Sequence, residues 1–186
     1  MACLIPVDAP GATLMSDRVI AAGPLTGEAF APFGEVIAHE GDAARRYLRL
    51  PLARELGAGE PRFWVTRVRE RAALPLRIAQ LERHPYSAQS FIPLHATRYL
   101  VVAAGSDARG LPDIGTMRAF IAAPHQGVCY RPGMWHHRLT ALDTPAEFAV
   151  IMSMTGRDDD DAWHDLAVAV QVIDLGGGDE VRHGCS

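Results

Sequence analysis

Lysine is absent from this chain, so its 18 Lys and Arg positions are all arginines. The formal net charge is −4, with eight histidines counted as neutral. Proteins that bind nucleic acid usually meet its phosphates with clustered basic side chains, and this charge provides no such excess. A nucleic-acid partner is therefore not expected. The planar guanidinium of arginine is suited to gripping a carboxylate, so a small acidic substrate remains compatible with the composition.

Cysteines are few and far apart. Cys3, Cys129 and Cys185 form no close pair, which argues against a zinc knuckle or a redox motif. The sequence also lacks an apolar run of the ~18 residues that a membrane-spanning helix needs. Its first residues show no basic segment followed by a long apolar one. We expect a cytoplasmic protein with reduced cysteines and no membrane partner.

Length and composition are those of one globular domain. Hydrophobic residues make up 48% and charged residues 22% of the 186 positions. We predict a single domain over 1–186 with a core at about 24–155. Residues 1–18 show no period and are expected to form an N-terminal extension, and the glycine-rich residues 176–186 a flexible tail.

Short strands dominate the middle of the chain. A brief helix capped by Thr26 and ended by Pro32 and Gly34 is predicted before a first short strand. The apolar and polar residues of 63–69 then alternate with the period of a strand. Further strands are predicted at 76–82, 90–94, 98–104, 117–122, 127–130 and 147–154. Six or more strands without helices between them favour a β-barrel or sandwich over a parallel α/β sheet.

An acidic run, Asp158 to Asp161, precedes an apolar segment near the C-terminus. Acidic residues at the start of a helix stabilise its dipole, so a C-terminal helix beginning near Asp160 is predicted. A site for a hard cation is the less favoured alternative, because the spacing lacks the glycine turn and distal glutamate of a calcium loop.

The segment from Leu81 to Leu94 carries the first chemically informative residues. On an extended chain Glu82 and His84 share one face, whereas Arg83 points to the other. Inside a barrel mouth this pair can bind a divalent metal or share acid–base work. The alternative is a solvated strand end.

The segment from Gly127 to Leu139 carries the second set. Pro132 and Gly133 predict a turn, and only one of the adjacent His136 and His137 can face inward from the strand that follows. Trp135 is expected in the core or at a rim, with a lid over a small ligand as the less favoured role.

Together the two segments resemble the two motifs of the cupin superfamily. Glu82, His84 and Gln89 occupy places comparable to the first motif, and Gly127, Pro132, Gly133 and His136 lie close to the second. A glutamate and a glutamine stand where the superfamily has a histidine and a glutamate. We therefore expect a labile metal site, if any, formed by Glu82, His84, Gln89 and His136.

At family level, residues 24–152 resemble the ureidoglycolate lyases. The resemblance is carried by the segments PLTGEAFAPFGEVI, LPLRIAQLERHPYSAQSFIPL, RYLVVAA and MRAFIAAPHQGVCYRPGMWHHRL. It implies a mainly β, cupin-like (RmlC-like) double-stranded β-barrel with a few peripheral helices, usually a homodimer. The implied activity is that of a carbon–nitrogen lyase of the amidine-lyase type, which cleaves ureidoglycolate to glyoxylate and urea in allantoin and purine catabolism. Nickel or a similar divalent metal is implied as a cofactor.

The chain departs from the family pattern in two places. Around Tyr47 it lacks the family's Asn-Asn-Gly run and its Arg-Tyr-His-Asp sequence, and after Met152 it replaces Asp-Arg-Gly and a downstream Asn-Cys with the acidic run. These differences bear on the substrate more than on the fold.

The resemblance leads to a hypothesis for each site residue. Glu82, His84 and His136 are the predicted catalytic residues, with His84 removing the hydroxyl proton and His136 or a water protonating the urea nitrogen. Either Arg98 or Arg118 is expected to hold the substrate carboxylate, and Tyr86 and Gln89 to orient the ureido group. For Tyr130, a structural role and a role at the site fit the sequence equally well. Two alternatives remain: a non-catalytic cupin-like module that binds a small acid, and a lyase or hydrolase of this fold acting on another ureido or hydroxy acid.

Overall fold

The computed structural model describes residues 18–174. The predicted tail, nearly all of the predicted N-terminal extension, Cys3 and Cys185 lie outside these residues. Strands prevail in the described part. Two short helices, α1 (Gly27–Phe30) and the 3₁₀ helix η1 (Leu50–Leu52), accompany β1 (Arg18–Pro24), β2 (Gly34–Ile37), β3 (Glu60–Val68), β4 (Leu76–Arg83), β5 (Gln89–Pro93), β6 (Tyr99–Ala104), β7 (Arg118–Ala122), β8 (Gly127–Tyr130), β9 (Trp135–His136), β10 (Thr140–Ala141), β11 (Ala146–Met154) and β12 (Ala162–Asp174).

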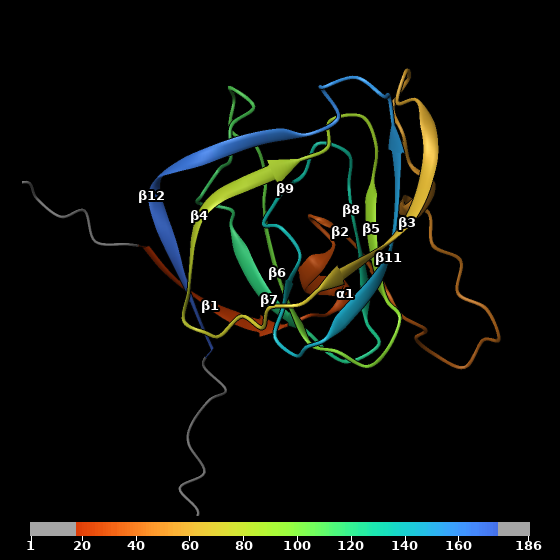
Figure 1. The fold of residues 1–186 in the computed structure, drawn as a ribbon, viewed down its shortest axis with the longest axis horizontal. Helices are drawn as coiled ribbons and strands as arrows, with labels where there is room; N and C mark the ends of the chain where they lie inside the picture. Colours follow the sequence, from red (N-terminus) through yellow and green to blue (C-terminus); the bar gives the residue numbers. More distant parts are fainter. Residues whose placement is uncertain (1–17, 175–186) are drawn as a thin grey trace, which may run out of the picture.

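The strands form two sheets that face each other. One sheet has the order β10-β6-β7-β1-β12-β4-β9, and β9 also pairs with β6, which closes this sheet on itself. The other has the order β2-β8-β5-β11-β3. Figure 1 shows the five-stranded sheet on the right and the closed sheet on the left. The predicted cupin-like β-barrel is confirmed.

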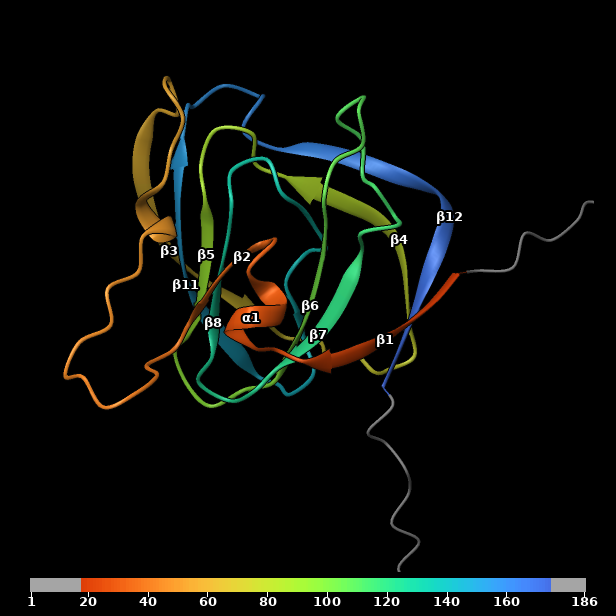
Figure 2. The ribbon, with the colours of Figure 1, turned by 180° about the vertical axis from the view of Figure 1, so that it is seen from behind.

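The hydrophobic core consists of two clusters of buried apolar residues. Between the two sheets, Phe30 of α1 is fully buried and packs edge-on against Phe120 and Tyr130, with ring centroids 5.8 and 5.7 Å apart. Phe30 is the only buried residue of α1, and Glu28 and Ala29 are exposed, so this peripheral helix inserts one side chain into the core. Figure 2 shows α1 from behind. A second apolar cluster, which includes Ile78, Leu81 and Trp135, is contributed by the closed sheet.

The predicted start of the fold is confirmed in detail. The Thr26 side chain accepts a hydrogen bond from the Ala29 amide at 3.2 Å and so caps α1. The predicted strands each correspond to an observed one, with ends that differ by a few residues. The strand predicted to begin at His136 corresponds to β9, whereas β1, β10 and β12 were not predicted, because β10 has two residues and the other two flank the expected core.

The predicted C-terminal helix is wrong, because residues 162–174 form the long strand β12. This strand pairs with β1 on one side and β4 on the other. Its first residues alternate between half-buried and exposed, which is the period of a strand. The preceding aspartates serve a loop instead: the Asp160 carboxylate accepts the amide hydrogens of Thr155 and Gly156 at 2.8 and 3.2 Å. The acidic run therefore folds a turn and does not start a helix.

Candidate functional site

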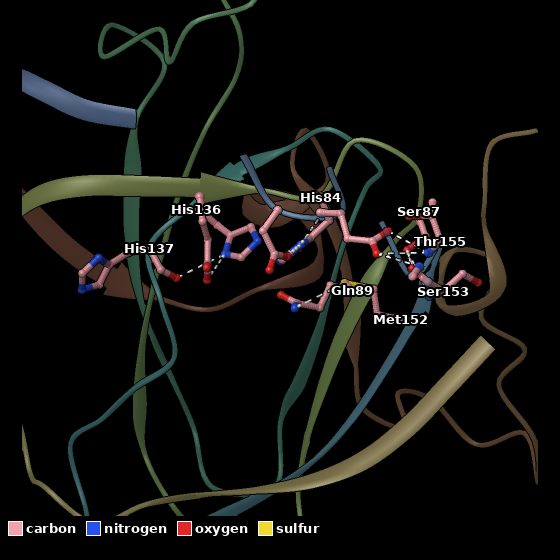
Figure 3. A network of polar contacts seen from close by, with 12 residues as sticks. His84, Ser87, Gln89, His136, His137, Met152, Ser153 and Thr155 are labelled. Carbon is pink, nitrogen blue, oxygen red and sulfur yellow. Dashed lines mark hydrogen bonds and ion pairs between the residues drawn. The ribbon is translucent and has the colours of Figure 1, made fainter. Parts of the chain in front are cut away.

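Glu82, His84 and His136 meet between the two sheets. Each offers one potential metal-ligand atom, and these three atoms lie within 4.8 Å of one another. The ring centroids of His84 and His136 are 5.2 Å apart. His84 is 6% and His136 1% exposed, and Glu82 is mostly buried. The structure thus brings together the three residues that the sequence predicted to carry the chemistry. Figure 3 shows His84 and His136 of this cluster.

Strand pairing explains how the two segments meet. Glu82 of β4 is the direct partner of His136 of β9, so the two side chains extend to the same face. His84 follows two residues after Glu82 and shares that face, whereas Arg83 packs over the Trp135 ring on the other side. The turn before β9 contributes as well: Gly133, with a φ of 71°, donates its amide hydrogen to the His84 carbonyl at 2.8 Å.

The His84 ring is oriented by the loop that precedes β12. Its Nδ1 lies 2.8 Å from the Asp161 carboxylate and 3.3 Å from the Asp160 carbonyl. Both partners only accept hydrogen bonds, so Nδ1 carries the hydrogen and Nε2 keeps a lone pair. The contact also lowers the pKa of Asp161, chiefly through its hydrogen bond to His84. The acidic loop therefore fixes the tautomer of a candidate catalytic residue.

The His136 ring is held by stacking and by its own backbone neighbour. Tyr130 lies parallel to it at a centroid distance of 4.2 Å and an interplanar angle of 10°. Its Nδ1 is 3.2 Å from the His137 carbonyl and 3.6 Å from a Glu82 oxygen. Burial, reinforced by His84, holds the pKa of His136 well below its ordinary value. His136 is therefore a neutral imidazole with its Nε2 lone pair available.

The pKa of Glu82 is shifted upward, in the direction opposite to that of His136. Burial raises the pKa of its carboxyl, and nearby Asp161 raises it further, whereas His84 and Arg138 lower it. A carboxyl with a raised pKa is suited to holding or passing a proton near neutral pH.

Three inward atoms of the cluster have no partner. Nε2 of His84, Nε2 of His136 and Oε1 of Gln89 are buried and make no hydrogen bond with any residue in 18–174. Buried polar atoms are normally satisfied, and metal-bound histidines typically use the other ring nitrogen to contact a carboxylate or carbonyl. Both histidines show that arrangement, so the residues fit a divalent metal. The predicted set of Glu82, His84, Gln89 and His136 supplies suitable donors.

Gln89 and Tyr86, predicted to orient the ureido group, are placed differently. Gln89 is buried, and its amide nitrogen is 3.6 Å from the Met152 sulfur, beside the cluster in Figure 3. The Tyr86 hydroxyl instead donates to Asp159 at 2.9 Å, and the Arg157 guanidinium lies over the Tyr86 ring. Tyr86 thus stabilises the acidic loop.

The two arginines predicted to bind the substrate carboxylate are otherwise engaged. Arg98 forms a bidentate pair with Asp143, with both N–O distances 3.0 Å, just before β6 begins. His136 pairs with Ala103, which is near the other end of β6. Arg98 therefore lies at the end of this strand that is away from the cluster. Arg118 of β7 is the neighbour of Ala103 on the other side of β6 and is therefore nearer to the cluster. Its guanidinium, however, donates to the backbone carbonyl of Met117 at 2.9 Å.

Sequence reasoning missed Asp161 and Arg138, which the fold brings to the cluster. Asp161 was assigned to a helix start, and its distance of 77 positions from His84 concealed their contact. The adjacent histidines divide as predicted: His136 faces the cluster, and His137 is half-buried with Nδ1 3.4 Å from the Gln80 carbonyl. Trp135 is a core residue, 2% exposed, whose indole donates to the Gly110 carbonyl at 3.2 Å.

Known proteins are similar in sequence to this chain over most of its length. A family model described as ureidoglycolate lyase matches residues 17–172. A protein of Mesorhizobium japonicum named ureidoglycolate lyase is 40% identical over 141 residues, covering 71% of this chain and 84% of the relative. Ureidoglycolate lyases of Pseudomonas paraeruginosa (37% over 142 residues; 72% and 83%) and Burkholderia cepacia (44% over 138 residues; 68% and 75%) are also similar. Within residues 18–174, neither helix has the length and apolar character needed to cross a membrane. The chain belongs to the ureidoglycolate lyase family.

Proposed function

We propose that this protein is a lyase that splits ureidoglycolate into glyoxylate and urea. The observation that supports the proposal most directly is the buried cluster of Glu82, His84 and His136, with two Nε2 atoms unpartnered within 18–174. Family membership and the names of the relatives support the same substrate. Assembly as a homodimer and a role in allantoin breakdown are parts of the proposal that come from the resemblance alone, and a cytoplasmic location is a part that comes from the sequence pattern.

The reaction requires two proton movements around one carbon atom. The hydroxyl proton leaves, its O–H electron pair forms the carbonyl of glyoxylate, and the carbon–nitrogen bond breaks with its pair going to nitrogen. That nitrogen then takes up a proton to give urea, so no other reactant is consumed. The base and the acid both need to act close to the same carbon, which a small buried cluster allows.

His84 is the residue best placed to accept the hydroxyl proton. Its Nε2 lone pair faces the cluster, and Asp161 on Nδ1 stabilises the imidazolium that results. His136 is poorly suited to donate a proton to the urea nitrogen, because its neutral ring carries its hydrogen on Nδ1. The Glu82 carboxyl, whose pKa is raised by burial, or a water beside it serves that step instead.

A divalent metal could instead be held by His84, His136, Glu82 and the Gln89 amide oxygen. The His84 Nε2 lone pair would then bind the ion and would not be free to accept the hydroxyl proton. Such an ion would polarise the substrate hydroxyl and offset its negative charge. In the metal-bound state the Tyr130 stack and the Asp161 contact keep the two imidazole rings oriented.

The test is to incubate purified protein with racemic ureidoglycolate and to measure glyoxylate and urea separately. Equal release of both products is expected, together with a loss of about 10²-fold or more in the variants His84→Ala and His136→Ala. His39→Ala, at an exposed position, serves as the matched control. Binding of ureidoglycolate without turnover would favour a non-catalytic acid-binding module. Turnover of a different ureido or hydroxy acid, but not of ureidoglycolate, would favour a lyase or hydrolase of this fold with another substrate.

A further inference from the structure

Arginines gather around one surface cavity of the molecule. The cavity measures about 510 Å³ and lies where the end of β3, the residues after it and the start of β4 approach the segment after β9. The charged residues that line it are Arg67, Arg69, Glu70, Arg71, Arg77 and Arg138.

The charge of this cavity is opposite to that of the whole chain. Five arginines and a single glutamate line it, although the formal net charge of the protein is −4. A concave surface lined by one sign of charge concentrates the field and raises the local concentration of small ions of the other sign. The lining therefore favours small anions.

The cavity adjoins the candidate site through Arg138. This residue follows His136 by two positions, and the segment from His137 to Ala141 forms one wall of the cavity. The Arg138 guanidinium also interacts electrostatically with the Glu82 carboxyl, lowering its pKa. Arg138 is therefore a cation of the cavity that acts on the cluster itself.

Arg138 is also available for a ligand. Its guanidinium forms no ion pair or hydrogen bond with any residue in 18–174, whereas the Arg67 guanidinium is bound to Glu147 with an Nε–Oε1 distance of 2.6 Å. The arginines considered from sequence, Arg98 and Arg118, are held by Asp143 and by backbone carbonyls respectively. A guanidinium that is not already paired keeps its fork free for a carboxylate.

We propose that this arginine-lined cavity admits small carboxylates to the cluster and that Arg138 binds the carboxylate of the substrate. The inference rests on the proposed function for the identity of the substrate but not for the binding of carboxylates. Arg69 and Arg71 contribute long-range attraction.

The test uses glycolate, a hydroxy acid without the ureido group, as the probe in isothermal titration at low ionic strength. Three proteins are compared: the unaltered chain, Arg138→Gln and Arg45→Gln. Arg45 is exposed and does not line the cavity, so its variant removes the same charge elsewhere. Binding is expected to weaken about 10-fold or more in Arg138→Gln and to stay unchanged in Arg45→Gln. A thermal melt confirms that each variant is folded.

Steady-state kinetics provide the second measurement. With ureidoglycolate, Arg138→Gln is expected to raise KM about 10-fold with kcat changed less than threefold, because a contact to the unreacting carboxylate acts on both ground and transition states. Equal glycolate affinity in the unaltered protein and Arg138→Gln, or no glycolate binding at all, overturns the inference. Binding that depends on Arg138, without release of glyoxylate from ureidoglycolate, keeps the inference and refutes the proposed function.

Discussion

The imidazole rings of His84 and His136 lie 5.2 Å apart, and in each the Nδ1 atom contacts an oxygen acceptor while Nε2 is buried without a partner within 18–174. His136 belongs to β9, whereas His84 directly follows β4, and the two residues are more than fifty positions apart in the chain. Each ring therefore keeps a buried lone pair within a cluster that also contains the Glu82 carboxyl, and both metal binding and proton transfer require such lone pairs.

Metal binding is expected to depend on all three residues of the cluster. Equilibrium dialysis of the purified protein against Ni²⁺ or Zn²⁺ should show one bound ion per chain. The variants His84→Ala, His136→Ala and Glu82→Gln should each weaken this binding by 10-fold or more, because each substitution removes one of the metal ligands. His95→Ala, which removes a histidine bound only to the Pro145 carbonyl, is the control. An ion retained at full affinity by the His84→Ala, His136→Ala double variant would place it elsewhere.

Asp161 is expected to act as a positioning residue for His84. Replacing it with asparagine removes the charge at the 2.8 Å contact and the preference for hydrogen on Nδ1. Metal affinity or kcat should fall about 10- to 100-fold, the usual scale for a partner of a functional histidine. Because Asp161 raises the pKa of Glu82, the proposed proton donor, the alkaline limb of the pH–rate profile should also move to lower pH in the variant.

The matched control for this experiment is Asp158→Asn, three residues earlier in the same exposed loop. An Asp161→Asn protein with unchanged rate and an unchanged pH profile would show that the contact is structural.

Stability is expected to fall in mild acid because of His137. Burial lowers the pKa of this histidine from its usual value of 6.5 to about 4, so the folded chain keeps it neutral. Between those two values the unfolded chain binds the additional proton, and the free energy of unfolding therefore decreases as the pH is lowered. The slope from one such group is at most about 1.4 kcal/mol per pH unit.

Urea unfolding of the metal-free protein at several pH values between 4 and 7 measures this slope. His137→Gln should reduce it, and His39→Gln, at an exposed position, should leave it unchanged. A slope that is the same in all three proteins would assign the acid sensitivity to other groups.

Cys129 is expected to resist alkylation in the folded protein. It is fully buried in β8, and burial raises the pKa of its thiol to about 11. The thiolate is the reactive form, so at pH 8 only about one molecule in a thousand carries it. Mass spectrometry after iodoacetamide treatment at pH 8 should find Cys129 unmodified in the native protein and modified in urea. Modification at equal rates in both conditions would contradict the burial.

Asp160 is expected to stabilise the loop before β12. Its carboxylate accepts the amide hydrogens of Thr155 and Gly156 and is almost fully buried. Asp160→Ala leaves these amides without that acceptor and should reduce the free energy of unfolding by about 1–3 kcal/mol. Urea denaturation compares it with Asp158→Ala. If the two variants unfold alike, the turn does not depend on this carboxylate.

Local features of the fold were readable without the structure. The Thr26 cap, the short strands and the shared face of Glu82 and His84 follow from the period of a strand and the chemistry of a helix terminus, both of which act within a few residues. The same local reasoning failed at the acidic run. Aspartates before an apolar segment fit a helix start, but β12 is held as a strand by β1 and β4 on its two sides.

The sequence by itself determined the class of the protein and pointed to the two segments whose residues Glu82, His84 and His136 form the candidate site. The tertiary structure decided which groups join them, because contacts such as His84 with Asp161 and Tyr130 with His136 depend on strand pairing and loop closure. It also tied Arg98 to Asp143 and left Arg138 beside the cluster. An arginine's availability for a substrate depends on its neighbours in space, and the order of residues along the chain does not give those neighbours.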